Sequence, residues 1–372
     1  MLEEPIDLRI DLRLDDLVDH HCHGILLADL DRAAYEGLMN EAAGRSPLGT
    51  TLFDSMLGLA IRRHCAPVLD LEPLAPAEEY LARRAELGGV EASRRLMART
   101  GIGTLLVDTG IGPDSLTPPD DLAHLCGGTA REVVRLERLA EQVLVAGSTD
   151  LPGEVEERLR AARGAGAVAA KSIAAYRVGL DLPAAKPSYD EVQRALASAD
   201  PARLVDRTVS GWLAHTALEA GLPLQVHVGY GDADVDLLGA DPLRLTAFLR
   251  ATRERGLPVL LLHNWPSHRQ AAYLAQVFDH VFLDLGLTTH NTGALSTGVL
   301  RETLEIAPFG KLLFSTDAYG LAELYLLGAV LFRRALASVL GELVALGDAT
   351  SEDAAYVAGL VARDNARRAY RL

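Results

Sequence analysis

The sequence has few cysteines and no long hydrophobic run, and each absence narrows the class of protein. Its 372 residues include only three cysteines, Cys22, Cys65 and Cys126, with no CxxC spacing. So few cysteines, in an odd number, argue against a disulfide framework and fit a reducing compartment. No uncharged apolar run approaches the roughly 18 residues of a membrane span. The most apolar stretch, which starts at Leu321, is interrupted by Glu323.

Basic charge is also scarce. The chain carries 36 Lys and Arg against 51 Asp and Glu, a net charge of −15 with a pI near 5.2. This balance argues against a nucleic-acid partner and against an anionic membrane surface. The first residues, MLEEPIDLRIDLRL, alternate in charge and are acidic, which is unlike a signal peptide. We therefore expect a cytoplasmic protein that acts on a small molecule; the oligomeric state stays open, a homo-oligomer included.

The apolar residues indicate the fold class. They make up 49% of the chain, enough for a large core, and strand-like runs alternate with helical stretches, as in β/α units. Eight strands are predicted: Leu17–His21, GTLLVDTG, a short one in REVVRLERLAEQV, GAGAVAAKS, LPLQVHV, LPVLLLH, HVFLDLG and KLLFSTD. A helical insertion at about 29–99 follows the first strand, a second insertion ends near residue 200, and SEDAAYVAGLVARDNARRAYRL predicts a terminal helix.

The spacing of the later strands supports a barrel. His263 lies 36 residues after His227, close to one β/α unit, and Asp317 follows 54 residues later, close to two. We therefore predict a single domain over residues 1–372 with an α/β fold, a (β/α)8 barrel of the TIM type. The alternative is a doubly wound open sheet, but no GxGxxG turn follows the first strand.

Imidazoles and a carboxylate stand at the carboxyl ends of four of these strands: His21 and His23, then His227, His263 and Asp317. Strand ends and the loops after them form the active face of a parallel β/α enzyme. Alternate residues of a strand point the same way, so the HxH pair can share one cation. This donor set predicts a divalent metal site, for which Zn²⁺ is the best match, with Mn²⁺ or Fe²⁺ as alternatives.

Each of these residues also has a plainer interpretation. The HxH pair can be a polar strand end, and His227 and His263 can bond to loops. Asp317 can be the N-cap of the helix that begins near Leu321. The coincidence on four strands favours the metal site over four independent structural roles.

Two cationic residues follow the fourth predicted strand. Lys171 closes a run rich in Ala and Gly; a buried lysine there could serve in chemistry, or its side chain could snorkel to the barrel mouth. Arg177 is a candidate clamp for a substrate carboxylate, with a surface salt bridge as the alternative.

Several neighbouring side chains are expected to be structural. His20 should point away from the HxH pair, and Cys22 should be a small buried filler. His268 and His290 follow strand ends and could contact the metal ligands without binding the metal themselves.

Taken together, these motifs resemble one family. HxH after the first strand, Lys after the fourth, His after the fifth and sixth and Asp after the eighth is similar to the pattern of the amidohydrolase superfamily. The segments KSIAAYRVGL, QVHVGYGDADVDL, LLLHNWPSHRQAAYLA and FSTDAYGLAELYLLGA resemble the amidohydrolase-2 domain that is fused to glutamine synthetase in fungal developmental and plant nodulin-like proteins. Because the sequence ends before any synthetase region, the resemblance implies a free-standing form.

The resemblance also implies roles. His21, His23, His227 and Asp317 would bind the metal. A carboxylated Lys171 would bridge two ions, with His227 and His263 on the second; otherwise one ion is bound and His263 polarises the substrate carbonyl.

The implied function is hydrolysis of a C–N amide bond in a small amino-acid-like substrate, with a γ-glutamyl amide suggested by the fusion partner. Asp317 would transfer the proton, and Arg177, Tyr230 and Asn264 would hold the substrate. The alternatives are a metal-dependent decarboxylase or other C–C lyase of the same superfamily, and a catalytically silent binding or regulatory protein.

Overall fold

The computed structural model describes residues 12, 14–44, 48–112, 115–197 and 199–372. The acidic N-terminal stretch, for which no signal peptide is expected, lies almost wholly outside these residues. Seven strands of the described chain form one parallel sheet, each paired with its neighbours in chain order. They are β1 (Leu17–Cys22), β2 (Ile102–Asp108), β3 (Thr129–Arg135), β4 (Ala169–Ser172), β5 (Leu224–Val228), β6 (Val259–His263) and β7 (Val281–Leu283). A doubly wound sheet would reverse its strand order, so that alternative is wrong.

The sheet is curled, and the segment predicted as an eighth strand lies between its two ends. Leu313 donates a backbone hydrogen bond to Leu283 of β7, and Asp317 donates one to His21 of β1. The segment is nevertheless irregular among the described residues. It forms only an isolated bridge to β7, between Leu312 and Leu283, and the Thr316 N–H and hydroxyl both donate to the Asp19 carboxylate. The expected eighth strand is therefore not a regular one.

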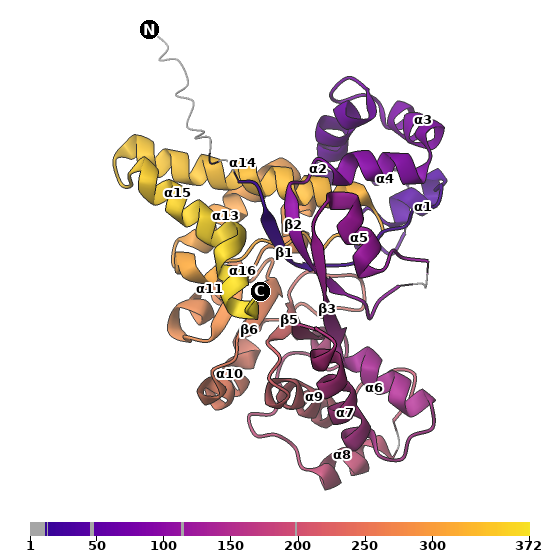
Figure 1. Ribbon diagram of the computed structural model, residues 1–372, viewed down its shortest axis with the longest axis vertical. Coiled ribbons are helices and arrows are strands. Elements are labelled where there is room, and N and C mark those ends of the chain that lie inside the picture. The colour runs from indigo at the N-terminus through magenta and orange to yellow at the C-terminus, as the bar shows by residue number, and fades with distance from the viewer. Residues whose placement is uncertain (1–11, 13, 45–47, 113–114, 198) are drawn as a thin grey trace.

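Helices surround the sheet on several sides (Figure 1). The region at about 29–99 is helical, as predicted, and contains α1 (Arg32–Gly37), α2 (Met56–Ala60), α3 (Ala77–Leu87) and α4 (Gly89–Met97). The other helices are α5 (Pro119–Cys126), α6 (Leu136–Val145), α7 (Leu151–Gly164), α8 (Tyr189–Leu196), α9 (Arg207–Glu219), α10 (Thr246–Thr252), α11 (His268–Val277), α12 (Gly286–Thr292), α13 (Ser296–Leu304), α14 (Ala322–Leu346), α15 (Ser351–Gly359) and α16 (Asn365–Tyr370).

Two sequence predictions differ from these bounds. The third strand begins at Thr129, earlier than the REVVRLERLAEQV region, and the second half of that region is α6. The predicted terminal helix is divided into α15 and α16 by a π-helical turn at Leu360–Asp364.

An apolar layer lies below the carboxyl ends of the strands, and the C-terminal helix α16 forms part of it. A compact cluster contains one residue from each of five strands, one from the irregular segment and three from α16: Val18, Leu106, Val133, Ala169, Leu260, Leu313, Ala366, Ala369 and Tyr370. In each strand the cluster residue lies two or three positions before a polar residue such as His21, Lys171 or His263. The apolar layer thus supports a polar layer at the strand ends, as layered side chains do in barrels.

The helical region at about 29–99 is fastened to α14 by a buried polar network. Arg84 Nε and the Tyr80 hydroxyl each donate to Glu323 Oε1 at 2.8 Å. The Arg84 guanidinium also lies over the ring of Tyr35, 5.3 Å from its centroid.

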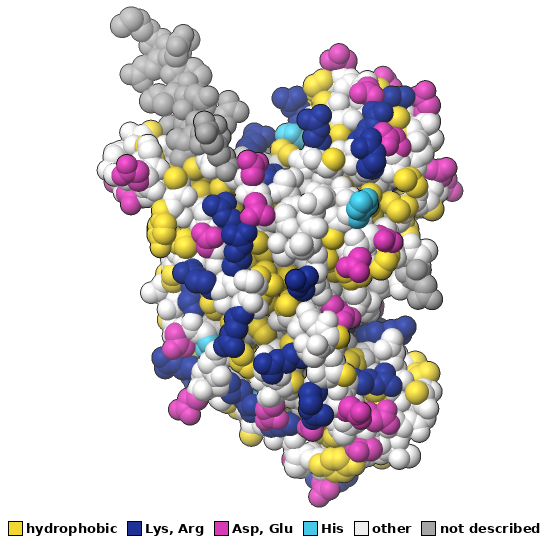
Figure 2. All heavy atoms as spheres, in the orientation of Figure 1, with side chains coloured by type: hydrophobic (Ala, Val, Ile, Leu, Met, Phe, Trp, Pro, Cys, Tyr) yellow, Lys and Arg dark blue, Asp and Glu magenta, His cyan; other side chains and the backbone are white. Residues whose placement is uncertain are grey.

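The outer surface carries both signs of charge, and Figure 2 shows acidic and basic side chains spread over one face. No helix in the described ranges combines the length and the apolar character needed to cross a bilayer.

Candidate active site

The ends of the strands enclose a cavity of about 590 Å³. Its wall includes six of the residues that the sequence singles out: His23, Lys171, Arg177, His227, His263 and Asp317. The segment 37–43, at the end of α1 and just after it, also lines the cavity. The helical insertion therefore contributes to the site directly.

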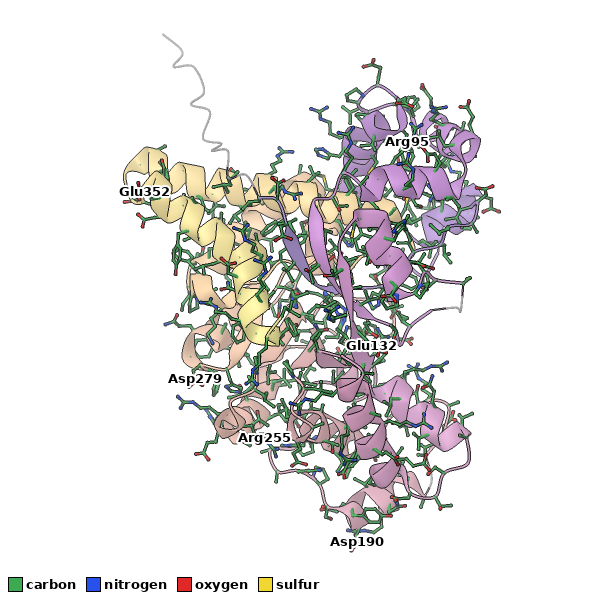
Figure 3. The ribbon with its side chains drawn as sticks, viewed as in Figure 1. Arg95, Glu132, Asp190, Arg255, Asp279 and Glu352 are labelled. Atoms are coloured by element: carbon green, nitrogen blue, oxygen red, sulfur yellow. The ribbon has the colours of Figure 1, made fainter. Side chains whose placement is uncertain are left out.

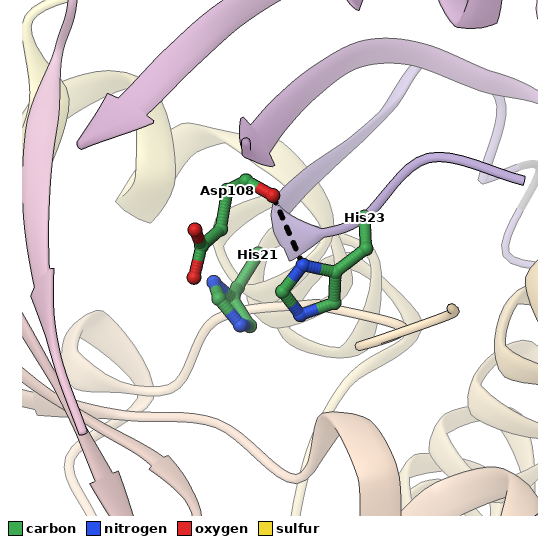
Figure 4. Close-up of side chains that lie close together, drawn as sticks. All are labelled: His21, His23 and Asp108. Carbon is green, nitrogen blue, oxygen red and sulfur yellow. Dashed lines mark hydrogen bonds between the residues drawn. The ribbon is translucent and has the colours of Figure 1, made fainter. Parts of the chain in front are cut away.

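His21 and His23 direct the same ring atom at one carboxylate oxygen. Their Nε2 atoms lie 3.0 Å and 3.3 Å from Oδ1 of Asp317. The other ring nitrogen of each histidine faces an acceptor: His21 Nδ1 lies 2.8 Å from Gln225 Oε1, and His23 Nδ1 lies 3.1 Å from the backbone oxygen of Asp108 (Figure 4). Since an acceptor must receive an N–H, both Nε2 atoms carry lone pairs. Two lone pairs and a carboxylate oxygen therefore converge on one point.

The surroundings of His21 and Asp317 favour the protonation states that metal binding requires. Burial, followed by the charge of Lys171, lowers the pKa of His21 to about 3, so the imidazole is neutral. For Asp317, burial opposes ionisation, but the nearby imidazoles of His263, His21 and His23 outweigh it and hold the pKa well below its usual value.

His263 approaches the same carboxylate from the other side. Its Nδ1 lies 3.4 Å from Oδ2 of Asp317, and its Nε2 is buried without a hydrogen-bond partner. His263 and Asp317 adopt left-handed backbone conformations, with φ of 69° and 51°. Non-glycine residues in this region are strained and concentrate at functional sites. The Asp284 carboxylate, which accepts the His263 backbone N–H at 2.6 Å, holds this conformation.

The imidazole of His227 lies next to that of His263. Its ring centroid is 4.6 Å from that of His263, and its Nε2 is buried without a hydrogen-bond partner. Among the described residues, the donor atoms that lie within 4.8 Å of one another form two groups. One contains His21, His23 and Asp108, and the other contains His21, His263 and Asp317. His227 belongs to neither, although it lines the same cavity.

Lys171 is buried inside this cluster. Only 2% of its side chain is exposed, so it does not snorkel to the barrel mouth. Its Nζ lies 3.0 Å from His21 Nε2 and 4.0 Å from Oδ2 of Asp108. Burial lowers the pKa of Lys171 to about 8, although the Asp108 carboxylate opposes this shift. Its carboxylation stays a prediction.

An ion pair that was not predicted from the sequence lies at the same edge of the sheet. Arg135, the last residue of β3, donates to both Asp108 carboxylate oxygens, with Nη2 2.7 Å from Oδ2. Asp108 ends the second predicted strand and carries the same signal as Asp317, a carboxylate at a strand end. Arg135 is harder to identify from the sequence, because the bounds of the third strand are not clear there.

The three predicted substrate-binding residues lie in different surroundings. Arg177 lines the cavity and forms an ion pair with Glu141 of α6 at 3.1 Å, while its Nε is buried without a partner. Asn264 is fully buried, and its amide nitrogen donates to the backbone oxygens of Leu261 and Asp284. Asn264 and Tyr230 are not among the residues that line the cavity. Of the three, only Arg177 is placed to meet a substrate.

The remaining alternatives are also resolved. The N-cap of α14 is Leu321, so Asp317 is not the cap of that helix. His20 is structural as expected, with 2.7 Å between its Nε2 and Asp284 Oδ2. Cys22 is fully buried. His290 lines the cavity, whereas His268 lies 2.8 Å from Glu302 and not at the site.

Part of the cavity lining carries carboxyl groups without a basic partner among the described residues. Glu41 and Asp232 form no ion pair with any described residue, whereas the neighbouring Asp234 is paired with Arg203 at 3.1 Å. Burial, followed by the charges of Asp317 and Asp232, raises the pKa of Glu41 to about 7. This part of the lining therefore holds two carboxyl groups that no described basic residue pairs with, and burial favours the neutral form of Glu41.

The sequence and the fold resemble those of known proteins. The Amidohydrolase family (Amidohydro_2) matches residues 114–372. Protein fluG of Emericella nidulans is 28% identical over 98% of this chain and 47% of its own length, so the chain spans about half of that curated relative. An inferred metal-dependent hydrolase from Lactobacillus casei is 28% identical, with a TM-score of 0.81 over 98% of this chain and 97% of that one. The uronate isomerase of Thermotoga maritima, 12% identical with a TM-score of 0.65 over the whole of both chains, shares the fold.

The chain belongs to the amidohydrolase family.

Proposed function

We propose that the protein hydrolyses a C–N amide bond of a small amino-acid-like substrate with the help of a divalent metal ion, Zn²⁺ by preference. The observation that carries the proposal is the convergence of the His21 and His23 lone pairs on the Asp317 carboxylate, 3.0 Å and 3.3 Å away. The irregular segment 312–317 completes the site because it delivers Asp317, and we propose that it takes the place of an eighth barrel strand.

The residues present fit such an ion. They are borderline nitrogen and oxygen donors, which Zn²⁺ accepts. His21 is neutral, Asp317 is ionised, and His263 and His227 each have a buried ring nitrogen without a hydrogen-bond partner. His21, His23, His227 and Asp317 would hold the ion, with His263 and a carboxylated Lys171 available for a second one. A bound divalent cation supplies Lewis acidity, which acidifies water and polarises a carbonyl oxygen.

Asp317 is the proton carrier in this proposal. Its ionised carboxylate takes a proton from the attacking water as the oxygen bonds to the amide carbon. It then gives that proton to the nitrogen as the C–N bond breaks, so the products are a carboxylic acid and an amine. His263 can donate an N–H to the carbonyl oxygen as negative charge develops there.

The charges on the cavity wall support an amino-acid-like substrate. Arg177 offers a buried, unpartnered Nε to a carboxylate. Glu41 and Asp232 offer unpaired carboxylates to an ammonium group. The rings of Tyr176 and Tyr319 line the same cavity and can attract a cation with their faces. A substrate with both charges, such as a γ-glutamyl amide, matches these groups of the cavity lining.

A substrate panel tests the proposal. We expect γ-glutamyl amides to release amine without CO₂, and N-acetylated analogues to react much more slowly because they lack the ammonium group. Glu41→Gln should reduce this preference, whereas Asp234→Asn, a change of a paired carboxylate on the same wall, should leave it nearly intact. Release of CO₂ instead of amine would indicate a C–C lyase.

A further inference from the structure

Behind the metal ligands, a buried chain of hydrogen bonds links His21 to the C-terminal helix. The side-chain oxygen Oε1 of Gln225, a residue of β5, lies 2.8 Å from His21 Nδ1. The Gln225 Nε2 atom lies 2.7 Å from the backbone oxygen of His20 and 2.8 Å from the Tyr370 hydroxyl. The Tyr370 hydroxyl lies 2.8 Å from His20 Nδ1. Gln225 and His21 are both fully buried, so these bonds do not compete with bulk water.

The direction of each bond follows from the donors and acceptors available. A backbone oxygen can only accept, so the Gln225 atom facing His20 is the amide nitrogen. The amide oxygen therefore faces His21 Nδ1, which must carry the proton. The second proton of the Gln225 amide goes to the Tyr370 oxygen, and the Tyr370 proton then goes to His20 Nδ1. His20 Nε2 in turn lies 2.7 Å from Asp284 Oδ2.

We propose that Gln225 and Tyr370 are positioning residues that fix His21 in the tautomer whose Nε2 lone pair faces the metal site. The proposal rests on the proposed role of His21 as a metal ligand. In the other tautomer Nε2 would carry a proton and could not bind a cation, and the Gln225 oxygen would face a lone pair.

The same chain of hydrogen bonds extends from His21 towards His263. Asp284, at its far end, also accepts the backbone N–H of His263 at 2.6 Å. Tyr370 belongs to the apolar cluster that α16 forms with the strands, so packing fixes the position of its hydroxyl. Docking of α16 thereby contributes to the geometry around His21, although Tyr370 lies 350 positions after His20 and 145 after Gln225 in the sequence.

The test measures the affinity of the metal-free full chain for Zn²⁺ by competition with a chelator. Gln225→Met keeps the volume but removes the acceptor, and it should weaken Zn²⁺ binding by about 10–100-fold, the usual effect of removing a group that orients a ligand. Gln225→Glu keeps an acceptor for His21 Nδ1 and should restore most of the affinity. Tyr370→Phe should weaken binding by a smaller factor, and Tyr80→Phe, which removes a buried hydroxyl elsewhere, should not.

A second readout is the tautomer itself, followed by nitrogen NMR of the histidine-labelled, metal-free chain. The signals of His21 should report a protonated Nδ1 in the unchanged chain and a mixture in Gln225→Met. If folded Gln225→Met and Tyr370→Phe both bind Zn²⁺ like the unchanged chain while His21→Ala does not, the inference is wrong and the ligand assignment stands. If His21→Ala also keeps its Zn²⁺ affinity, the proposed metal site itself is wrong.

Discussion

Lys171 Nζ lies 3.0 Å from His21 Nε2. Two nitrogen atoms at this distance can bond only if one donates and the other accepts. His21 Nδ1 already donates to Gln225, so Nε2 is the acceptor and Lys171 is the donor. The lysine thus uses the lone pair that a metal ion would need. A cation and the Lys171 proton therefore compete for the same atom, and metal binding requires the lysine to move or to lose its charge.

We predict that Lys171 resolves this competition as a carboxylated bridge between two ions. The active protein should then bind about two metal ions per chain, and bicarbonate during reconstitution should raise the activity. Burial lowers the pKa of Lys171 from its usual 10.5 to about 8, so the neutral amine that reacts with CO₂ becomes more abundant as the pH rises through 8. Occupancy by the second ion, measured by elemental analysis, should increase over the same range.

Lys171→Ala provides the contrast. It should lose the second ion and recover partly when a small carboxylic acid replaces the missing carbamate. One ion per chain in the fully active protein, or full retention of metal in Lys171→Ala, would show that Lys171 acts as a free amine.

We predict that Asp317→Asn folds normally but loses turnover by a factor on the order of 10² or more, the scale of general acid–base groups. Asparagine cannot accept the water proton. Steady-state rates and circular dichroism of the same preparation check both parts. A well-folded Asp317→Asn protein with near-normal rates would contradict the proton-transfer role.

The strand-end residues were predictable because they follow a simple rule of parallel sheets. Apolar runs that end in His or Asp place those side chains at one edge, and the structure puts His23, His227, His263 and Asp317 around one cavity. The order of the strands was predictable for the same reason, since each run is short and is followed by a helical stretch.

The supporting contacts were not predictable from the sequence. Gln225 lies within a strand, and nothing in LPLQVHV distinguishes an amide that orients a metal ligand from one that faces a helix. The sequence predicts a regular strand before Asp317, where the structure has an irregular segment. The hydrogen bonds to Asp19 that accompany this irregularity depend on tertiary contacts, so the sequence does not reveal them. Glu41 and Asp232 lie far apart in the sequence and share a wall only after the insertion has folded over the cavity.

We predict that replacing both His21 and His23 by alanine removes the bound metal. Their Nε2 atoms are the two lone pairs that converge on Asp317, so the double variant leaves a carboxylate without its nitrogen partners. Elemental analysis of protein purified without chelator measures the loss. His268→Ala is the matched control, because that imidazole pairs with Glu302 outside the cavity. Unchanged metal content in the double variant would rule out this site.

The last prediction concerns the buried ion pair between Arg84 and Glu323, which fastens the helical insertion to α14. Both side chains are nearly inaccessible, at 4% and 0% exposure. Glu323→Ala would leave an unpaired buried guanidinium, so it should lower the free energy of unfolding by about 3–5 kcal/mol. The double variant Arg84→Met with Glu323→Leu should recover much of this loss, because no buried charge remains unpaired.

The surface pair between Arg253 and Asp279 is the control; Asp279 lies at the periphery in Figure 3. Because both side chains are more than half exposed, Asp279→Ala should change the free energy of unfolding by only about 0–1 kcal/mol. Urea denaturation of the four proteins gives the comparison. If Glu323→Ala and Asp279→Ala destabilise equally, the buried pair does not hold the insertion in place, and the wall formed by residues 37–43 must depend on other contacts.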